Sequence, residues 1–176
     1  MAKKLFCVPY AGGNATLFNR LTVFWEDTVE VIAFEYPGHG VRIKENYSSS
    51  IEQLGKECAN FIKGKIGADD EIYILGYSMG SLVAYEAICI LEKEMGVDVK
   101  CFFAAANQAP CKQGIVFEEF GDEALMEQNI LELGGFDKRL ASNSRYMDMV
   151  LPILKSDFVL LNKYRGQMHD LSLIHI

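Results

Sequence analysis

Short apolar segments with the character of β-strands alternate with helical segments over the first 106 residues of this chain. Apolar side chains at helical spacing predict helices over residues 15–25, 51–66 and 81–94, and Ser50 is suited to cap the second of them. The strands are expected at residues 4–8, 30–36, 71–75 and 101–106. This alternation predicts an α/β fold with a parallel sheet and helices on both of its faces.

After Pro110 the alternation stops. Helices are expected over residues 117–133 and 136–164, with no strand between them. A helical segment over residues 112–165 would be either a lid above the strand ends or a subdomain that completes the fold, and periodicity does not separate these alternatives. The length of 176 residues suits one domain, so we expect a single domain over residues 1–176.

The composition excludes several classes of function. Seventeen basic and 24 acidic side chains leave a net charge of −7, which is unfavourable for binding nucleic acid. No apolar run is long enough to span a bilayer, and the N-terminal apolar stretch is too short for a signal peptide, so we expect a cytoplasmic protein without membrane contact. The five cysteines are odd in number and widely spaced, which argues against a disulfide framework and against a structural zinc site.

Residues 76–80 read Gly-Tyr-Ser-Met-Gly, a GxSxG motif that directly follows an expected strand and directly precedes an expected helix. In this context the motif predicts a nucleophile elbow, a tight turn that lifts the serine above the strand ends. Ser78 is therefore the candidate nucleophile. The backbone amide of Met79, at the start of the helix, is a candidate donor to the oxyanion of the reaction.

Residues 9–14 form a second glycine-containing loop, after the first expected strand. A hydrolase of this type needs a second oxyanion donor from such a loop, and the amide of Ala11 is our choice, with Tyr10 and Gly12 as alternatives. An ordinary strand-to-helix turn or a phosphate loop are other interpretations, but the GxxxxGK[ST] and GxGxxG spacings are both absent. His39, in the turn at 36–42, precedes Ser78 in the chain, whereas the order in such hydrolases is Ser, acid, His. We therefore expect His39 to be a structural residue of its turn.

Together these motifs resemble the type II thioesterases, α/β-hydrolase-fold enzymes that accompany nonribosomal peptide and polyketide synthases. The resemblance implies hydrolysis of acyl thioesters on the phosphopantetheine arm of an acyl or peptidyl carrier protein, through an acyl-serine intermediate. It implies no metal and no cofactor beyond the phosphopantetheine of the partner. Ser78 matches the nucleophile, and Met79 and Ala11 match the oxyanion donors. The segments that carry the resemblance are 5–15, 36–42, 76–80, 101–106 and 151–158, followed by Tyr164.

The chain departs from the family pattern after Tyr164. There the family continues with two further strands, one followed by the catalytic acid and the other by a Gly-Gly-His segment with the base, and neither motif is present here. We therefore expect an α/β-hydrolase-like sheet that lacks its last strands, no acid or base in this chain, and an inactive or weakly active protein. Asp137 or Asp157 with His169 would have the order of a substitute triad, but neither aspartate follows an expected strand.

Three further expectations follow. The strand at 101–106 would form an exposed sheet edge, which favours dimers or aggregation.

A small-molecule serine esterase and a non-catalytic module that binds acyl groups or carrier proteins are alternative functions. Five basic residues could offset the acidic charge toward an acidic carrier protein, or could simply be a solvated helix face. They are Lys138, Arg139, Arg145, Lys163 and Arg165.

Overall fold

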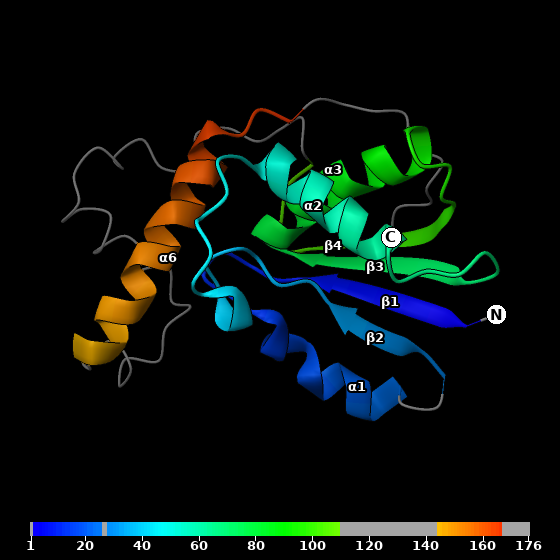
Figure 1. The fold of residues 1–176 in the computed structure, drawn as a ribbon, viewed down its shortest axis with the longest axis horizontal. Helices are drawn as coiled ribbons and strands as arrows, with labels where there is room; N and C mark the ends of the chain where they lie inside the picture. Colours follow the sequence, from blue (N-terminus) through cyan, green and yellow to red (C-terminus); the bar gives the residue numbers. More distant parts are fainter. Residues whose placement is uncertain (1, 26–27, 110–143, 167–176) are drawn as a thin grey trace.

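A computed structural model describes residues 2–25, 28–109 and 144–166 of the chain. Its centre is a four-stranded sheet with the order β2-β1-β3-β4, in which every pair of neighbouring strands is parallel (Figure 1). Because the strands are parallel, their carboxyl ends and the loops that follow them lie at the same edge of the sheet. The strands are β1 (Lys3–Val8), β2 (Glu30–Ala33), β3 (Glu71–Tyr77) and β4 (Val99–Ala105).

The helices connect the strands and cover both faces of the sheet, with α1 on one face and α2 and α3 on the other (Figure 1). Ser50 caps α2 as expected, since its hydroxyl accepts a hydrogen bond from the Gln53 amide at 3.1 Å. Gly96 follows α3 with φ 62°, a left-handed conformation that favours glycine. The helices are α1 (Asn19–Trp25, after a 3₁₀ turn at Ala15–Phe18), α2 (Ile51–Lys63), α3 (Met79–Lys93) and α6 (Ser144–Lys163).

The alternation of side chains along β1 explains why both faces are covered. Phe6 and Val8 pack into a large core with α2, α3 and α6, while Leu5 and Cys7 pack into a smaller core with Phe18 on the opposite face. Side chains of a strand point alternately to the two faces, so a strand that is apolar on both sides must be covered on both. The predicted sheet, covered by helices on both faces, is confirmed.

The boundaries of several elements differ from those expected. The second strand ends at Ala33 rather than at residue 36, because the chain turns toward Pro37, although the Phe34 amide still donates to the Cys7 carbonyl at 2.8 Å. The third strand extends to Tyr77, directly before Ser78. In the first helical segment Phe18 is buried but Phe24 is 79% exposed, so helical spacing there did not indicate a buried face.

Part of the expected helical segment at 112–165 lies outside the described residues, including all of 117–133. Within it the structure describes α6 over Ser144–Lys163, which includes Pro152, while residues 136–143 of the expected helix also lie outside the described residues. None of the described helices is both long enough and apolar enough to cross a membrane. Within the described sheet β4 pairs only with β3, so it is an end strand as expected, whereas dimerisation through it stays a prediction.

The cysteines that the structure describes behave as core residues. Cys7, Cys58 and Cys89 are buried and Cys101 is partly buried, and all four are free thiols. Burial raises the pKa of Cys7 to about 12 and, together with the charge of Glu86, that of Cys89 to about 11. Neither thiol therefore forms a nucleophilic thiolate near neutral pH.

Candidate active site

Ser78 lies in the turn between β3 and α3. Its backbone has φ 51° and ψ −118°, a conformation that costs a non-glycine residue free energy and that commonly occurs at functional sites. Three hydrogen bonds hold the turn: the Ser78 amide donates to Ala105 O at 2.8 Å, while the Ser78 carbonyl accepts from Asn107 Nδ2 at 2.7 Å and from the Ser81 amide at 2.9 Å. The side chain is partly exposed at the carboxyl edge of the sheet.

The two glycines of the motif are required by close backbone contacts. A Cβ atom on Gly80 would overlap the carbonyl oxygen of Val8, at the end of β1, and one on Gly76 would lie 2.5 Å from the Gly80 carbonyl oxygen. The first turn of α3 can therefore approach β1 only without a side chain at Gly80, and β3 only without one at Gly76. The result is the strand–turn–helix geometry of a nucleophile elbow.

The loop after β1 forms a second turn beside the elbow. The Gly13 amide donates to Tyr10 O at 2.9 Å, and Gly12 has φ 76°, so residues 10–13 form a β-turn that needs glycine at its third position. The rings of Tyr10 and Tyr77 meet edge to face at 5.7 Å, which links this turn to the residue before Ser78. The two turns are neighbours because β1 and β3 are adjacent, with Val8 opposite Gly76.

Amides in this region differ in how they are used. The Gly12 amide donates to Asp157 Oδ2 at 2.7 Å, whereas the Ala11 amide has no hydrogen-bond acceptor among the residues that the structure describes. Met79 is the first residue of α3, where an amide has no acceptor within its own helix and the helix dipole favours negative charge. The sequence offered three amides of this loop as the second oxyanion donor, those of Tyr10, Ala11 and Gly12. Of these, the Gly12 amide is already engaged.

His39 and Asp157 form a buried pair that contacts the Tyr10–Gly13 turn through the Gly12 amide. Each residue is 2% exposed, and His39 Nε2 lies 2.9 Å from Asp157 Oδ2, while His39 Nδ1 lies 3.0 Å from the Pro37 carbonyl oxygen. Burial acts to lower the pKa of His39, but the hydrogen bond and charge of Asp157, with smaller contributions from Pro37 and Glu35, outweigh it and raise the pKa above its usual value.

The expectation that His39 is structural fits these contacts, since both ring nitrogens are engaged away from Ser78. Among the described residues none forms a hydrogen bond with the Ser78 hydroxyl. The structure does not support a substitute triad of Asp157 with His169, because the Asp157 carboxylate is engaged with His39 and Gly12. Asp137 and His169 lie outside the described residues.

Sequence reasoning did not find the pairing of Asp157 with His39. A signal was present: Asp157 lies on α6 among Leu154, Phe158 and Leu161, all of them buried. A carboxylate on the apolar face of an amphipathic helix needs a partner. In the part of the chain that the structure describes, no cluster of three or more His, Cys, Asp or Glu side chains could hold a metal ion, and independence from metals and cofactors stays a prediction.

A search of protein-family models matches residues 3–176 to one family, described as the Thioesterase domain. The chain belongs to this family. The match confirms the resemblance found in the motifs, and the parallel sheet is that of α/β-hydrolase-fold thioesterases.

Curated relatives support the same assignment. The chain is 29% identical over 164 residues to thioesterase PikA5 of Streptomyces venezuelae, covering 93% of this chain and 58% of that protein. It is also 29% identical over 166 residues to the gramicidin S biosynthesis protein GrsT of Aneurinibacillus migulanus, covering 92% and 63%. The chain thus spans about three fifths of the length of these relatives.

Solved structures agree in fold. RedJ, a thioesterase from the prodiginine biosynthetic pathway in Streptomyces coelicolor, has a TM-score of 0.83 and 27% identity, and the match covers 95% of this chain and 62% of RedJ. ClbQ, from the colibactin NRPS/PKS pathway, has a TM-score of 0.84 and 26% identity, covering 98% and 72%. The described elements therefore have the arrangement found in thioesterases of biosynthetic pathways.

Proposed function

We propose that this chain carries the nucleophile and the oxyanion donors of an editing thioesterase, which hydrolyses acyl thioesters on the phosphopantetheine arm of carrier proteins. The observation that carries the proposal is the backbone of Ser78, held at φ 51° between β3 and the first residue of α3. A serine in this conformation, partly exposed beside a glycine turn, suits nucleophilic attack on a carbonyl group. A relative named as a thioesterase, PikA5, one named for gramicidin S biosynthesis, GrsT, and the structural neighbour ClbQ from an NRPS/PKS pathway support the substrate class.

The reaction would begin with attack of Ser78 Oγ on the thioester carbonyl carbon. As the new C–O bond forms, the carbonyl electrons move to oxygen, where the Met79 and Ala11 amides donate hydrogen bonds to the negative charge. Collapse of this intermediate breaks the C–S bond, and the thiolate of the phosphopantetheine arm leaves and takes up, through water, the proton that Ser78 Oγ lost on attack. Water then attacks the acyl-serine, which releases the carboxylic acid and restores the serine.

The proton of Ser78 has no acceptor among the described residues, and the sequence carries neither of the motifs expected for acid and base. Without a base a serine hydroxyl is a weak nucleophile. An oxyanion hole without its triad still leaves roughly 10³–10⁴-fold catalysis over water. We therefore expect the 176-residue chain alone to turn over thioesters well below the ordinary enzyme range of about 1–10³ per second.

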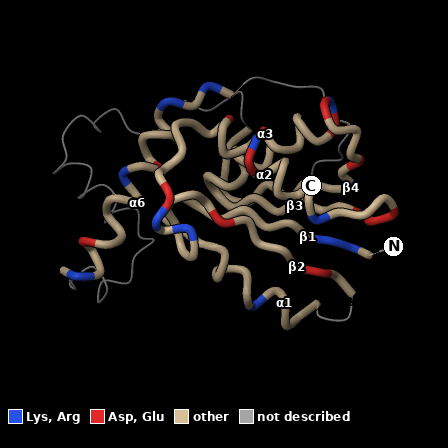
Figure 2. The backbone as a smooth tube through the Cα atoms, in the orientation of Figure 1, with Lys and Arg blue, Asp and Glu red and all other residues tan. Residues whose placement is uncertain are grey.

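The proposed partner is an acyl or peptidyl carrier protein. The basic residues on and after α6 are candidates for the surface that would bind it. Arg145 lies at the start of α6 and Lys163 at its end, so about 27 Å of helix rise separates them, and Arg165 follows Lys163 by two residues. Basic residues lie toward both ends of this helix in Figure 2. Lys138 and Arg139 lie outside the described residues. The described members of the proposed basic set therefore lie at two separate positions and do not form one patch. The end of α6 with Lys163 and Arg165 is the one that packs on the core, through Tyr164.

Labelling with a fluorophosphonate tests the proposal directly. Because Ser78 has no base among the described residues, the reaction should be slow. Prolonged incubation should nevertheless modify the wild-type chain at Ser78, detected by intact mass and peptide mapping, and leave Ser78→Ala unmodified. A carrier protein loaded with an acyl thioester should then be deacylated faster than an oxyester of the same acyl group. Equal or faster oxyester cleavage would indicate the small-molecule esterase instead. Absence of labelling, with retained binding of the loaded carrier, would indicate the non-catalytic module.

A further inference from the structure

Asp157 joins three segments that are distant in the sequence. Its Oδ2 atom lies 2.7 Å from the amide of Gly12, 145 residues away, and 2.9 Å from Nε2 of His39, 118 residues away. Leu154, one helical turn earlier on α6, occupies the space that a Cβ atom of Gly12 would need. One face of α6 therefore contacts the Tyr10–Gly13 turn through both a charged group and an apolar side chain.

Hydrogen-bond chemistry defines the protonation state that this arrangement favours. The carbonyl oxygen of Pro37 can only accept, so His39 Nδ1 must carry a proton. Asp157 Oδ2 already accepts from the Gly12 amide, and an ionised carboxylate can accept a second N–H from His39 Nε2. With both ring nitrogens donating, the pair is an imidazolium and a carboxylate, which makes the bond to Gly12 charge-assisted.

The Gly12 amide is the neighbour of the proposed oxyanion donor. Residues 11 and 12 are the two central residues of the turn, so fixing the Gly12 amide also fixes the peptide plane between them and limits the orientation of Ala11. The bond to Asp157 additionally occupies the Gly12 N–H, so this amide is not free to donate to a substrate oxygen. The amides of Tyr10 and Ala11 then remain without an acceptor among the described residues, and of these two residues Ala11 adjoins the peptide plane that the Gly12 bond fixes.

We propose that Asp157 and His39 are positioning residues, which hold the Tyr10–Gly13 turn through the Gly12 amide so that the Ala11 amide points at the substrate carbonyl. This inference rests on the proposed function. It gives α6 a role in the chemistry, because the readiness of the oxyanion hole then depends on the docking of this helix. A displacement of about 1 Å in such a group costs on the order of 10²-fold in rate.

The test compares four variants of the full chain. Asp157→Asn keeps the shape but removes the charge, and His39→Ala leaves the buried carboxylate without its partner. His39→Gln places an amide nitrogen near the position of Nε2 and can still donate to Asp157. The matched control is Asp148→Asn, which makes the same chemical change at an exposed position of the same helix.

Two readouts separate positioning from mere stabilisation. The first is reaction of Ser78 with a fluorophosphonate, resolved into its maximal rate constant and its half-saturating concentration, at a temperature where each variant is fully folded. Asp157→Asn and His39→Ala should lower the maximal rate constant about 10–10²-fold with little change in half-saturation, and His39→Gln should restore most of it. The second is hydrogen exchange at the Gly12 amide, which should accelerate in both defective variants and not in Asp148→Asn.

The outcomes distinguish this inference from the proposed function. A wild-type Ser78 that reacts no faster than Ser78→Ala is modified elsewhere, even on prolonged incubation, overturns the proposed function, and the positioning role with it. A reactive wild type whose Asp157→Asn and His39→Ala variants react as fast as Asp148→Asn overturns the positioning role alone. Unchanged exchange at Gly12 also overturns it, whatever the rates, because the bond to Asp157 would then not control this turn.

Discussion

The two turns at the carboxyl edge of the sheet are held in different ways. The Ser78 turn is held mainly by backbone atoms of its neighbours, Ala105 O and the close approach to Val8 O. The Tyr10–Gly13 turn has one internal hydrogen bond, and its other contacts include a side-chain carboxylate on α6. Backbone groups carry no titratable charge, whereas the second turn depends on a charged pair. The nucleophile should therefore be fixed by the sheet, and its oxyanion donor by the docking of a helix.

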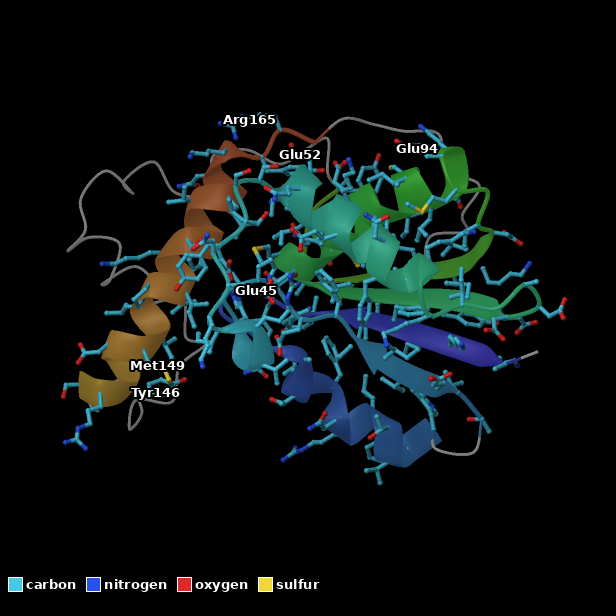
Figure 3. All side chains as sticks on the ribbon, in the orientation of Figure 1. Glu45, Glu52, Glu94, Tyr146, Met149 and Arg165 are labelled. Carbon is cyan, nitrogen blue, oxygen red and sulfur yellow. The ribbon has the colours of Figure 1, made fainter. Side chains whose placement is uncertain are left out.

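This difference matters because α6 is less enclosed than α3, which begins at the elbow: seven of its 20 residues are buried, against 11 of 15 in α3. Its first turns extend away from the sheet, where Tyr146 and Met149 are labelled in Figure 3, and Met149 is 58% exposed. Its last turns join the core, where the Tyr164 hydroxyl donates to Glu86 at 2.6 Å. Asp157 lies between these two ends. The site thus combines a nucleophile that backbone contacts hold with a donor that depends on the packing of a less enclosed helix.

The largest effect is expected from Gly80→Ala, which tests whether the sheet fixes the nucleophile. The new Cβ atom would overlap the Val8 carbonyl oxygen, and because both groups belong to the backbone of packed elements, neither can move aside cheaply. We expect a loss of about 3 kcal/mol in the free energy of unfolding, measured by urea denaturation, and loss of Ser78 labelling.

Gly64→Ala is the control for that substitution. Gly64 ends α2 with φ −72°, and its nearest neighbour to a new Cβ atom is at an ordinary 3.4 Å. It should change the free energy of unfolding by less than about 1 kcal/mol and with a stabilising sign. Equal stability of the two variants would show that the close approach of α3 to β1 does not constrain the elbow.

A smaller effect is expected from Ser81→Ala. The Ser81 hydroxyl is buried and contacts the carbonyl oxygens of Gly76 at 2.8 Å and Ala105 at 3.1 Å, on either side of the elbow. Ala105 O keeps the Ser78 amide as a donor, so the loss should be about 1 kcal/mol in thermal or urea denaturation. Ser48→Ala, which removes one weak bond of 3.3 Å, should cost less. A cost for Ser81→Ala no larger than that would mean the hydroxyl is dispensable for the elbow.

The elbow could be predicted from sequence because its determinants are contiguous. A strand, a GxSxG segment and a helix specify the turn with no knowledge of distant residues. The choice among the three amides of the other loop could not be made in the same way. It depends on Asp157, 145 residues from Gly12, and no periodicity reports which atoms a tertiary fold brings together.

The boundaries show the same limit on a smaller scale. The apolar run that suggested a strand to residue 36 ends as a strand at Ala33, yet Phe34 and Tyr36 are buried all the same. Tyr36 is held by its hydroxyl, which donates to Pro9 O at 2.7 Å. Apolar character predicts burial well and strand length poorly, because loops near a site also enter the core.

The smallest effect should be a pH dependence that His39 gives to stability, and it tests the charged pair itself. The pKa of His39 is raised in the folded chain, so its contribution is complete below the unfolded value of about 6.5 and is lost as pH rises through the higher folded value. The difference in unfolding free energy between wild type and His39→Gln should therefore shrink from pH 6 to pH 8.5, in urea titrations at fixed ionic strength.

Taking the difference between wild type and His39→Gln cancels the pH dependence that comes from titratable groups present in both proteins. Those that face His39 are Asp157 on α6, Glu35 after β2, and the rings of Tyr36 and Tyr47. Burial, with the charge of Asp157 as a further cause, raises the pKa of each tyrosine above its usual value of about 10, so neither ionises in this range. A difference that stays constant or grows with pH would mean that His39 is neutral in the folded chain. The turn would then be held without a charged pair, and the contrast with the elbow would disappear.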